Sequence, residues 1–138
     1  MPRVQLALNV DDLERSVAFY SKLFDAAPAK ERPGYANFAL DDPALKLVLI
    51  ENPGHGGTLN HLGVEVGSSD DVTAADHRLR RRDLETRAEE GVDCCYALQD
   101  KVWVDDPDGA PWEVYTVLHD SSTEVEASCC AGAGAGCC

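Results

Sequence analysis

Two stretches of the chain decide its fold: Gln5-Leu6-Ala7-Leu8-Asn9-Val10 and, 56 residues further along, His61-Leu62-Gly63-Val64-Glu65-Val66. In both, leucine or valine occupies every second position, which is the alternation of a strand that buries one face. Each stretch leads through a pair of aspartates, at 11–12 and 70–71, into a segment with the apolar spacing of a helix. A repeated strand and helix indicates that one structural unit occurs twice.

The segments around these stretches complete the same unit. Apolar residues that share one helical face follow the aspartates: Leu13, Val17, Tyr20 and Phe24 in the first half, and Val72, Ala75 and Leu79 in the second. We expect further strands at residues 35–40, 45–51, 95–98, 101–104 and 112–118. The pattern predicts an α+β fold of two βαβββ modules, whose curved mixed sheet surrounds a shared cleft.

Length and charge limit the class of protein. The 138 residues suffice for one domain, which we place at residues 1–120, with half-repeats at about 1–52 and 58–119. Residues 121–138 lack apolar periodicity, so we expect a flexible, cysteine-containing tail. The net charge of −13 disfavours nucleic acids and anionic membranes as partners. The sequence shows neither a signal peptide nor a membrane span, and we expect a cytoplasmic protein.

The six cysteines occur as three adjacent pairs: Cys94 with Cys95, Cys129 with Cys130, and Cys137 with Cys138. Adjacent cysteines form poor structural disulfides, because closing the ring strains the peptide between them. In a reducing compartment, such pairs favour metal or thiol chemistry. Cys94 and Cys95 can converge on one ion only in a loop, and residues 91–93 are predicted to begin one.

Gln5 and His61 occupy the same position in the two repeated strands, so both can face the cleft. Glu113 lies between Trp112 and Val114 in the last expected strand. One nitrogen and two oxygen donors suit an octahedral ion with open positions, so Fe(II), Mn(II), Co(II) or Ni(II) fits better than a closed zinc site. Taken singly, each of the three side chains is also compatible with an ordinary structural role.

Several longer motifs resemble the vicinal oxygen chelate superfamily, which contains glyoxalase I, extradiol dioxygenases and bleomycin-resistance proteins. They are Gln5, Asp11 to Tyr20, His61 to Val64, and Asp106 to Val114. Further segments look like the cadmium-induced protein and organoarsenical lyase branch of that superfamily: Arg3 to Leu8, Pro33 to Ala39, Leu45 to Leu49, Cys94 to Ala97, and Gln99 to Val104. The resemblance covers the chain to about residue 119.

The resemblance implies a site and a reaction. Gln5, His61 and Glu113 would hold Fe(II), while Cys94 and Cys95 would hold the trivalent arsenic of a small organoarsenical such as methylarsenite. With O₂ as co-substrate, the carbon–arsenic bond would be cleaved to release inorganic arsenite. The fourth ligand of glyoxalase I, a glutamate, is expected at the place of Lys46, which has no lone pair for a metal. Aromatic residues expected to line the cleft are Tyr35, Tyr96 and Trp103.

Two other functions fit the same residues. A protein that sequesters Cd²⁺ or arsenite would need the thiols but neither iron nor oxygen. A glyoxalase-like metalloenzyme or thiol transferase would need the metal and a base but not Cys94 and Cys95. Whether the protein cleaves organoarsenicals or sequesters Cd²⁺ or arsenite, four tail cysteines could capture a soft ion: Cys129, Cys130, Cys137 and Cys138. The sequence is compatible with a monomer or a homodimer.

Overall fold

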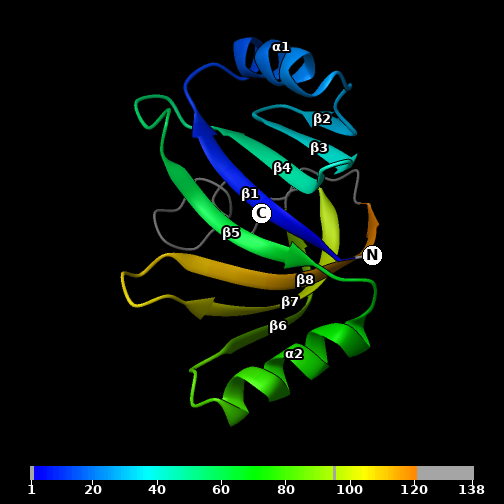
Figure 1. Cartoon of the computed structure of the whole chain (residues 1–138), viewed down its shortest axis with the longest axis vertical. Helices are drawn as coiled ribbons and strands as arrows, with labels where there is room; N and C mark the ends of the chain where they lie inside the picture. The colour runs from blue at the N-terminus through cyan, green and yellow to red at the C-terminus, as the bar shows by residue number, and fades with distance from the viewer. Residues whose placement is uncertain (1, 95, 121–138) are drawn as a thin grey trace.

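The computed structural model describes residues 2–94 and 96–120, so the predicted tail at 121–138 lies outside the described residues. The elements, in chain order, are β1 (Arg3–Val10), α1 (Leu13–Phe24), β2 (Lys30–Arg32), β3 (Tyr35–Asp41), β4 (Ala44–Glu51), β5 (Leu59–Glu65), α2 (Ser69–Arg81), β6 (Arg87–Cys94), β7 (Ala97–Asp105) and β8 (Pro111–Asp120). They repeat a βαβββ unit twice, as predicted (Figure 1).

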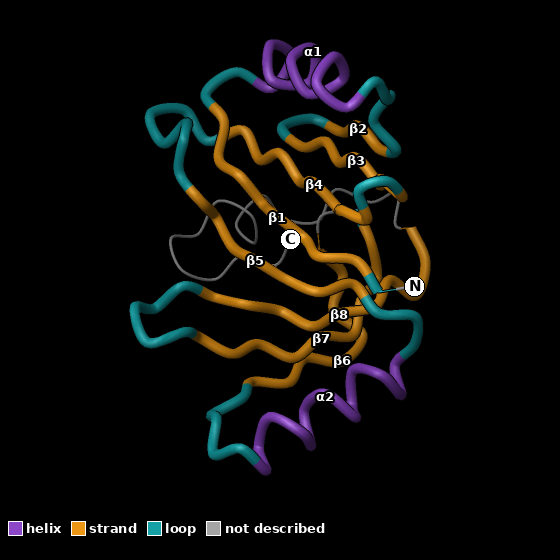
Figure 2. Tube along the Cα trace, viewed as in Figure 1, coloured by secondary structure: helices purple, strands orange, loops and turns teal. Residues whose placement is uncertain are grey.

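The eight strands form one curved sheet in the order β2-β3-β4-β1-β5-β8-β7-β6. β1 and β5 are antiparallel and join the two halves at its centre, whereas β1 with β4 and β5 with β8 are parallel pairs. Figure 2 shows the sheet curling around its concave side, with both helices outside it. The mixed sheet and the duplicated modules confirm the predicted α+β fold.

The register of β1 against β5 relates the two halves by a local twofold axis. Gln5 lies opposite Gly63, and Ala7 lies opposite His61. Rotation about the axis therefore exchanges Gln5 with His61, which confirms that the two repeated strands present them equivalently. The same operation also relates the outer strands β4 and β8.

The register corrects one expectation about β4. Glu113 pairs with Gly63, and the residue that pairs with Ala7 in the equivalent place is Val48. Val48 rather than Lys46 thus occupies the position related to Glu113. Lys46 lies two residues away on the same face, because side chains of a strand alternate with period two. Neither residue offers a metal ligand, so the prediction that this position lacks a fourth protein ligand is unchanged.

Both helices cover the outer face of the sheet. Asp12 caps α1 by accepting a hydrogen bond from Arg15 N at 3.0 Å, and Ser68 caps α2 in the same way through Asp71 N at 3.2 Å. The predicted apolar stripes are confirmed. The stripe of α1 packs on β1, β3 and β4, and that of α2 is buried against β7 and β8.

The structure differs from the predicted strands near the cysteine pair. Residues 91–93, expected in a loop, belong to β6, while residues 97–105 form one strand, β7, instead of two. β6 carries an extra residue between Glu89 and Val92, where Gly91 has a positive φ of 59°. This bulge and the polar composition of β6 remove the apolar alternation by which a strand is recognised. β2 was also not predicted.

Among the described residues, no helix is both long and apolar enough to span a lipid bilayer.

Candidate metal centre

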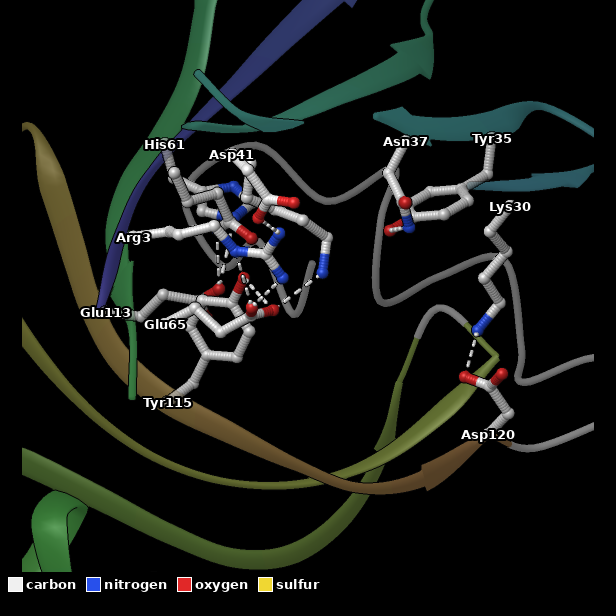
Figure 3. A network of polar contacts seen from close by, with 12 residues as sticks. Arg3, Lys30, Tyr35, Asn37, Asp41, His61, Glu65, Glu113, Tyr115 and Asp120 are labelled. Atoms are coloured by element: carbon white, nitrogen blue, oxygen red, sulfur yellow. Dashed lines mark hydrogen bonds and ion pairs between the residues drawn. The ribbon is translucent and has the colours of Figure 1, made fainter. Parts of the chain in front are cut away.

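Gln5, His61 and Glu113 meet on the concave side of the sheet, from β1, β5 and β8. Their side chains are buried, with at most 1% of each residue exposed. Gln5 Nε2 donates to Glu113 Oε1 at 2.8 Å and lies 3.2 Å from His61 Nε2, which is 3.5 Å from Glu113 Oε1. Figure 3 shows His61 and Glu113 pointing toward one another from neighbouring strands. The structure therefore brings the three predicted side chains together.

The surroundings of His61 fix the orientation of its ring. Nδ1 lies 2.8 Å from Asn60 Oδ1, which favours a proton on Nδ1 and a lone pair on Nε2. The Trp103 ring packs edge-on against the imidazole, with 5.5 Å between ring centres. Trp103, one of the aromatic residues expected to line the cleft, lies buried beside His61.

Lys101, which the sequence analysis did not single out, reaches Glu113 from β7. Its Nζ lies 2.9 Å from Glu113 Oε2, and both side chains are fully buried. Burial raises the pKa of Glu113, but the neighbouring polar groups, foremost the positive charge of Lys101, outweigh it and hold that pKa below its ordinary value. The carboxylate is therefore ionised at neutral pH.

The spacing of Gln5 Nε2, His61 Nε2 and Glu113 Oε1 is compatible with a metal ion once the Gln5 amide is turned so that its oxygen takes the place of Nε2. Two ligands about 2.1 Å from an ion, at right angles to one another, are about 3.0 Å apart, and the three separations here are 2.8, 3.2 and 3.5 Å. Among the described residues, no group of three His, Cys, Asp or Glu side chains is placed to bind a metal. The candidate centre consequently depends on the Gln5 amide.

A cavity of about 220 Å³ adjoins the triad and has Gln5 in its wall. A larger hollow of about 530 Å³ beside α1 contains none of the three residues. The smaller cavity is lined mainly by polar side chains: Lys30, Asn37, Lys46, Glu65, Gln99, Tyr35, Tyr115 and Asp120. Because Gln5, one of the three side chains that converge, lies in its wall, it is the candidate substrate cavity.

Glu65 organises one wall of this cavity. It accepts from Lys46 Nζ at 2.8 Å, Arg3 Nη2 at 2.7 Å and the Tyr115 hydroxyl at 3.3 Å (Figure 3). Burial raises the pKa of Glu65, but Lys46 and Arg3 together lower it below its ordinary value. Lys46, expected at a ligand position, is thus engaged in an ion pair.

Tyr35 and Tyr96 lie where strands from the two halves meet across the cavity. Tyr35 lines the cavity as predicted, and burial raises its pKa to about 12, so its hydroxyl stays protonated. Tyr96 packs against Tyr35, with 6.4 Å between ring centres, but is not among the lining residues. The backbone carbonyl of Tyr96 accepts from Lys30 Nζ at 2.6 Å.

Of the predicted thiol pair, the structure describes the backbone of Cys94. Cys94 ends β6, with its backbone paired to Ala97, and Cys95 lies outside the described residues. Tyr96, the next described residue, contacts Tyr35 of the cavity wall. Cys129, Cys130, Cys137 and Cys138 also lie outside the described residues.

Three supporting residues escaped the sequence analysis: Asn60, Glu65 and Lys101. Glu65 belongs to the repeated stretch, four residues after His61, and its inward position follows from the strand period. Lys101 had no comparable signal, because a lysine in a strand is ordinarily exposed. Its burial is understandable only once Glu113 is known to face it.

The sequence matches the family model of the glyoxalase/bleomycin resistance protein/dioxygenase superfamily over residues 3–114. Cadmium-induced protein CadI of Mycobacterium tuberculosis (strain ATCC 25618 / H37Rv) is 68% identical over 123 residues, which cover 89% of this chain and 81% of the relative. A trivalent organoarsenical cleaving enzyme of Thermomonospora curvata is 54% identical over 151 aligned residues, covering 100% of both chains.

Solved structures share the fold at lower identity. The Mn(II)-bound glyoxalase from Novosphingobium aromaticivorans aligns with a TM-score of 0.62 at 18% identity, covering 92% of this chain and 44% of that one. Homoprotocatechuate 2,3-dioxygenase from Arthrobacter globiformis aligns with a TM-score of 0.61 at 21% identity, covering 87% and 36%. This chain thus spans less than half of either structure, and the likeness concerns the fold alone.

Proposed function

Because the chain belongs to the glyoxalase/bleomycin resistance protein/dioxygenase superfamily, we propose that it is an Fe(II)- and O₂-dependent enzyme that cleaves the carbon–arsenic bond of trivalent organoarsenicals. The convergence of Gln5, His61 and Glu113 beside a cavity is the observation that carries the proposal. The name of the Thermomonospora curvata relative, a trivalent organoarsenical cleaving enzyme, supports the choice of substrate.

Gln5, His61 and Glu113 would hold the metal. The Gln5 amide carries an oxygen and a nitrogen, and a half turn about its last bond exchanges them, so that the oxygen faces the ion. Bound Fe(II) supplies a centre at which O₂ reacts next to the substrate. Val48, at the position related to Glu113, adds no ligand, so the protein would supply three ligands and leave the metal accessible to O₂ and substrate.

Cys94 and Cys95 would hold the arsenic. Trivalent arsenic is soft and prefers thiolates, and two neighbouring thiols chelate it more tightly than one. Tyr96, which follows the pair in the sequence, contacts Tyr35 of the cavity wall, and this contact supports a role for the pair at the cavity. Holding the substrate there places the carbon–arsenic bond near the metal and lowers the entropic cost of the reaction.

The reaction balances with O₂ as the only oxidant. One oxygen atom goes to arsenic, which leaves as inorganic arsenite, and the other goes to carbon. For a methyl substituent, the organic product is then the corresponding aldehyde. Protonated Tyr35 on the cavity wall can donate a hydrogen bond to an oxygen atom of the substrate or product, whereas the Tyr115 hydroxyl already donates to Glu65.

A second candidate is sequestration of Cd²⁺ or arsenite without catalysis. The 68% identity with cadmium-induced protein CadI favours it, as do the three cysteine pairs. Sequestration requires the thiols but not the buried triad. A glyoxalase-like reaction is less favoured, because the position related to Glu113 carries the apolar Val48.

The test loads the protein with Fe(II) without air, adds methylarsenite, admits O₂ and measures inorganic arsenite. The wild type should release arsenite, while His61→Ala and Cys94→Ser should reduce release at least 100-fold. His77→Ala, on the exposed part of α2, is the matched control and should retain full activity. Tight arsenical binding with no arsenite release from the wild type would favour sequestration.

A further inference from the structure

Lys101 is a buried cation that contacts one oxygen of the Glu113 carboxylate. It is 1% exposed and lies on β7, two residues from Trp103. Removing an ammonium group from water costs several kcal/mol unless an opposite charge compensates for it. The Glu113 carboxylate, 2.9 Å away, supplies that charge.

The two oxygens of Glu113 have different partners. Oε1 accepts from Gln5 Nε2 at 2.8 Å and lies 3.5 Å from His61 Nε2, so it faces the place where the donors converge. Oε2 accepts from Lys101 Nζ at 2.9 Å. One oxygen of the carboxylate thus faces the candidate metal position, and the other faces the lysine.

The side chains packed around Lys101 hold its ammonium group next to Oε2 of Glu113. Trp103 pairs with Glu113 across β7 and β8 and packs against His61. Lys101 Nζ lies 5.4 Å from the centre of the same indole ring. The ammonium is held between an aromatic face and a carboxylate oxygen, and all three side chains are buried.

We propose that Lys101 is a positioning residue that restricts Glu113 to coordination through a single oxygen, Oε1. A carboxylate that binds through both oxygens fills two positions of an octahedral ion, whereas one that binds through a single oxygen fills one. Lys101 thus preserves the third open position. The inference rests on the proposed metal site but not on the identity of the substrate.

The first experiment counts the water molecules bound to Mn(II) in wild type and Lys101→Met, by their effect on the relaxation of water protons. Mn(II) accepts the same nitrogen and oxygen donors, and three protein ligands leave about three water positions. Methionine keeps the length of the apolar stem but cannot hold Oε2. We expect Glu113 to bind through both oxygens in this variant, which lowers the inner-sphere relaxivity per bound ion by about one third.

The affinity for Mn(II), measured by the spin-resonance signal of the free ion, separates positioning from a merely structural role. Loss of the neighbouring positive charge should leave Lys101→Met with equal or tighter Mn(II) binding. A structural role predicts weaker binding with unchanged relaxivity per bound ion, and that result would overturn the proposal. Lys22→Met removes an exposed lysine from the last turn of α1, away from the three donors, and should match the wild type.

A second measurement needs no variant and applies even if Lys101→Met fails to fold. Infrared difference spectra of wild type with and without Mn(II), with and without ¹³C-labelled glutamate, report the carboxylate stretches of Glu113. A wider gap between the asymmetric and symmetric stretches on metal binding indicates one-oxygen coordination, and a narrower gap contradicts it. Failure of the wild type to bind Mn(II) would instead refute the metal site in the proposed function.

Discussion

Gly63 shows how closely the backbone approaches the candidate metal centre at the level of one residue. A methyl group at Gly63 would lie 2.8 Å from the Glu113 carbonyl oxygen, 2.9 Å from Glu113 Cγ and 3.1 Å from Gln5 Nε2. The carbonyl belongs to the paired strand β8 and cannot move without disturbing the sheet. Glycine is therefore required between the side chains of Gln5 and Glu113.

We predict that Gly63→Ala lowers the free energy of unfolding by about 1–3 kcal/mol, because the added methyl group overpacks the site. Mn(II) affinity should fall as well, since Gln5 and Glu113 are pushed apart. Urea unfolding and metal titration measure the two effects. Gly67→Ala is the control, because its methyl group would meet only Asp71 Oδ2 at 3.7 Å, and equal losses in both variants would contradict the explanation.

Glu65 should make stability depend on pH. Its pKa is lowered in the folded protein, so the stabilisation is fully present above the ordinary value of 4.5 and is lost as the pH falls through the folded-state pKa. Glu65→Gln should cost about 2–3 kcal/mol at pH 7, because Lys46 and Arg3 lose their shared partner.

Urea unfolding at pH 7 and at pH values below 4.5 compares this variant with the wild type. The difference between them should shrink as the pH falls and vanish in acid. Glu31→Gln, an exposed carboxylate on β2, should behave like the wild type throughout. A difference that is independent of pH would mean that the ion pairs of Glu65 do not cause the loss.

At the scale of elements, the three-residue strand β2 ties the first half to the second. Lys30 Nζ donates to the Tyr96 carbonyl at 2.6 Å and pairs with Asp120 Oδ1 at 3.1 Å, and Arg32 lies 5.8 Å from the Tyr96 ring centre. These contacts join β2 to the residue that precedes β7 and to the end of β8, and Figure 3 shows the pairing of Lys30 with Asp120.

Lys30→Met should loosen these ends without unfolding the molecule. We expect amide hydrogen exchange at Ala97 and near the end of β8 to become faster, with a global loss of about 1 kcal/mol. Exchange measured by mass spectrometry tests this expectation, with β1 as the internal control because it lies at the centre of the sheet. Uniform acceleration in β1 as well would contradict a local effect.

The elements show which signals can be read from sequence. Strands β1 and β5 and both helical stripes were predicted correctly, because one apolar face of each packs against the other layer. β6 was missed because it is largely polar, bulged at Gly91 and located at an edge. An edge strand is held by backbone hydrogen bonds on one side. Because these bonds do not require a particular side-chain pattern, the sequence gives little indication of them.

At the scale of the whole molecule, duplication made two members of the triad, Gln5 and His61, predictable. Gln5 and His61 could be paired by the repeat alone, and the local twofold axis between β1 and β5 now explains why they converge. The exact partner of Glu113 in the first half could not be predicted, because it depends on register rather than on residue type. The role of Lys101 likewise depends on a contact between neighbouring strands.

The tail cysteines give a prediction for the full chain. If Cys129, Cys130, Cys137 and Cys138 capture substrate, replacing all four by serine should leave turnover at saturating methylarsenite unchanged and lower the rate at limiting methylarsenite several-fold. Steady-state kinetics of the variant and the wild type test this. Identical rates at limiting substrate would show that the tail thiols have no part in capture.

The curled sheet does not close into a barrel, and its order leaves β2 and β6 at the two edges. Both edge strands are charged: β2 is Lys30-Glu31-Arg32, and β6 contains Arg87, Glu89, Glu90 and Asp93. Charged side chains disfavour the addition of another strand to an open edge, since they would be desolvated or repelled there. The open architecture that gives the cleft its access is thereby protected against edge-to-edge aggregation, even at high protein concentrations.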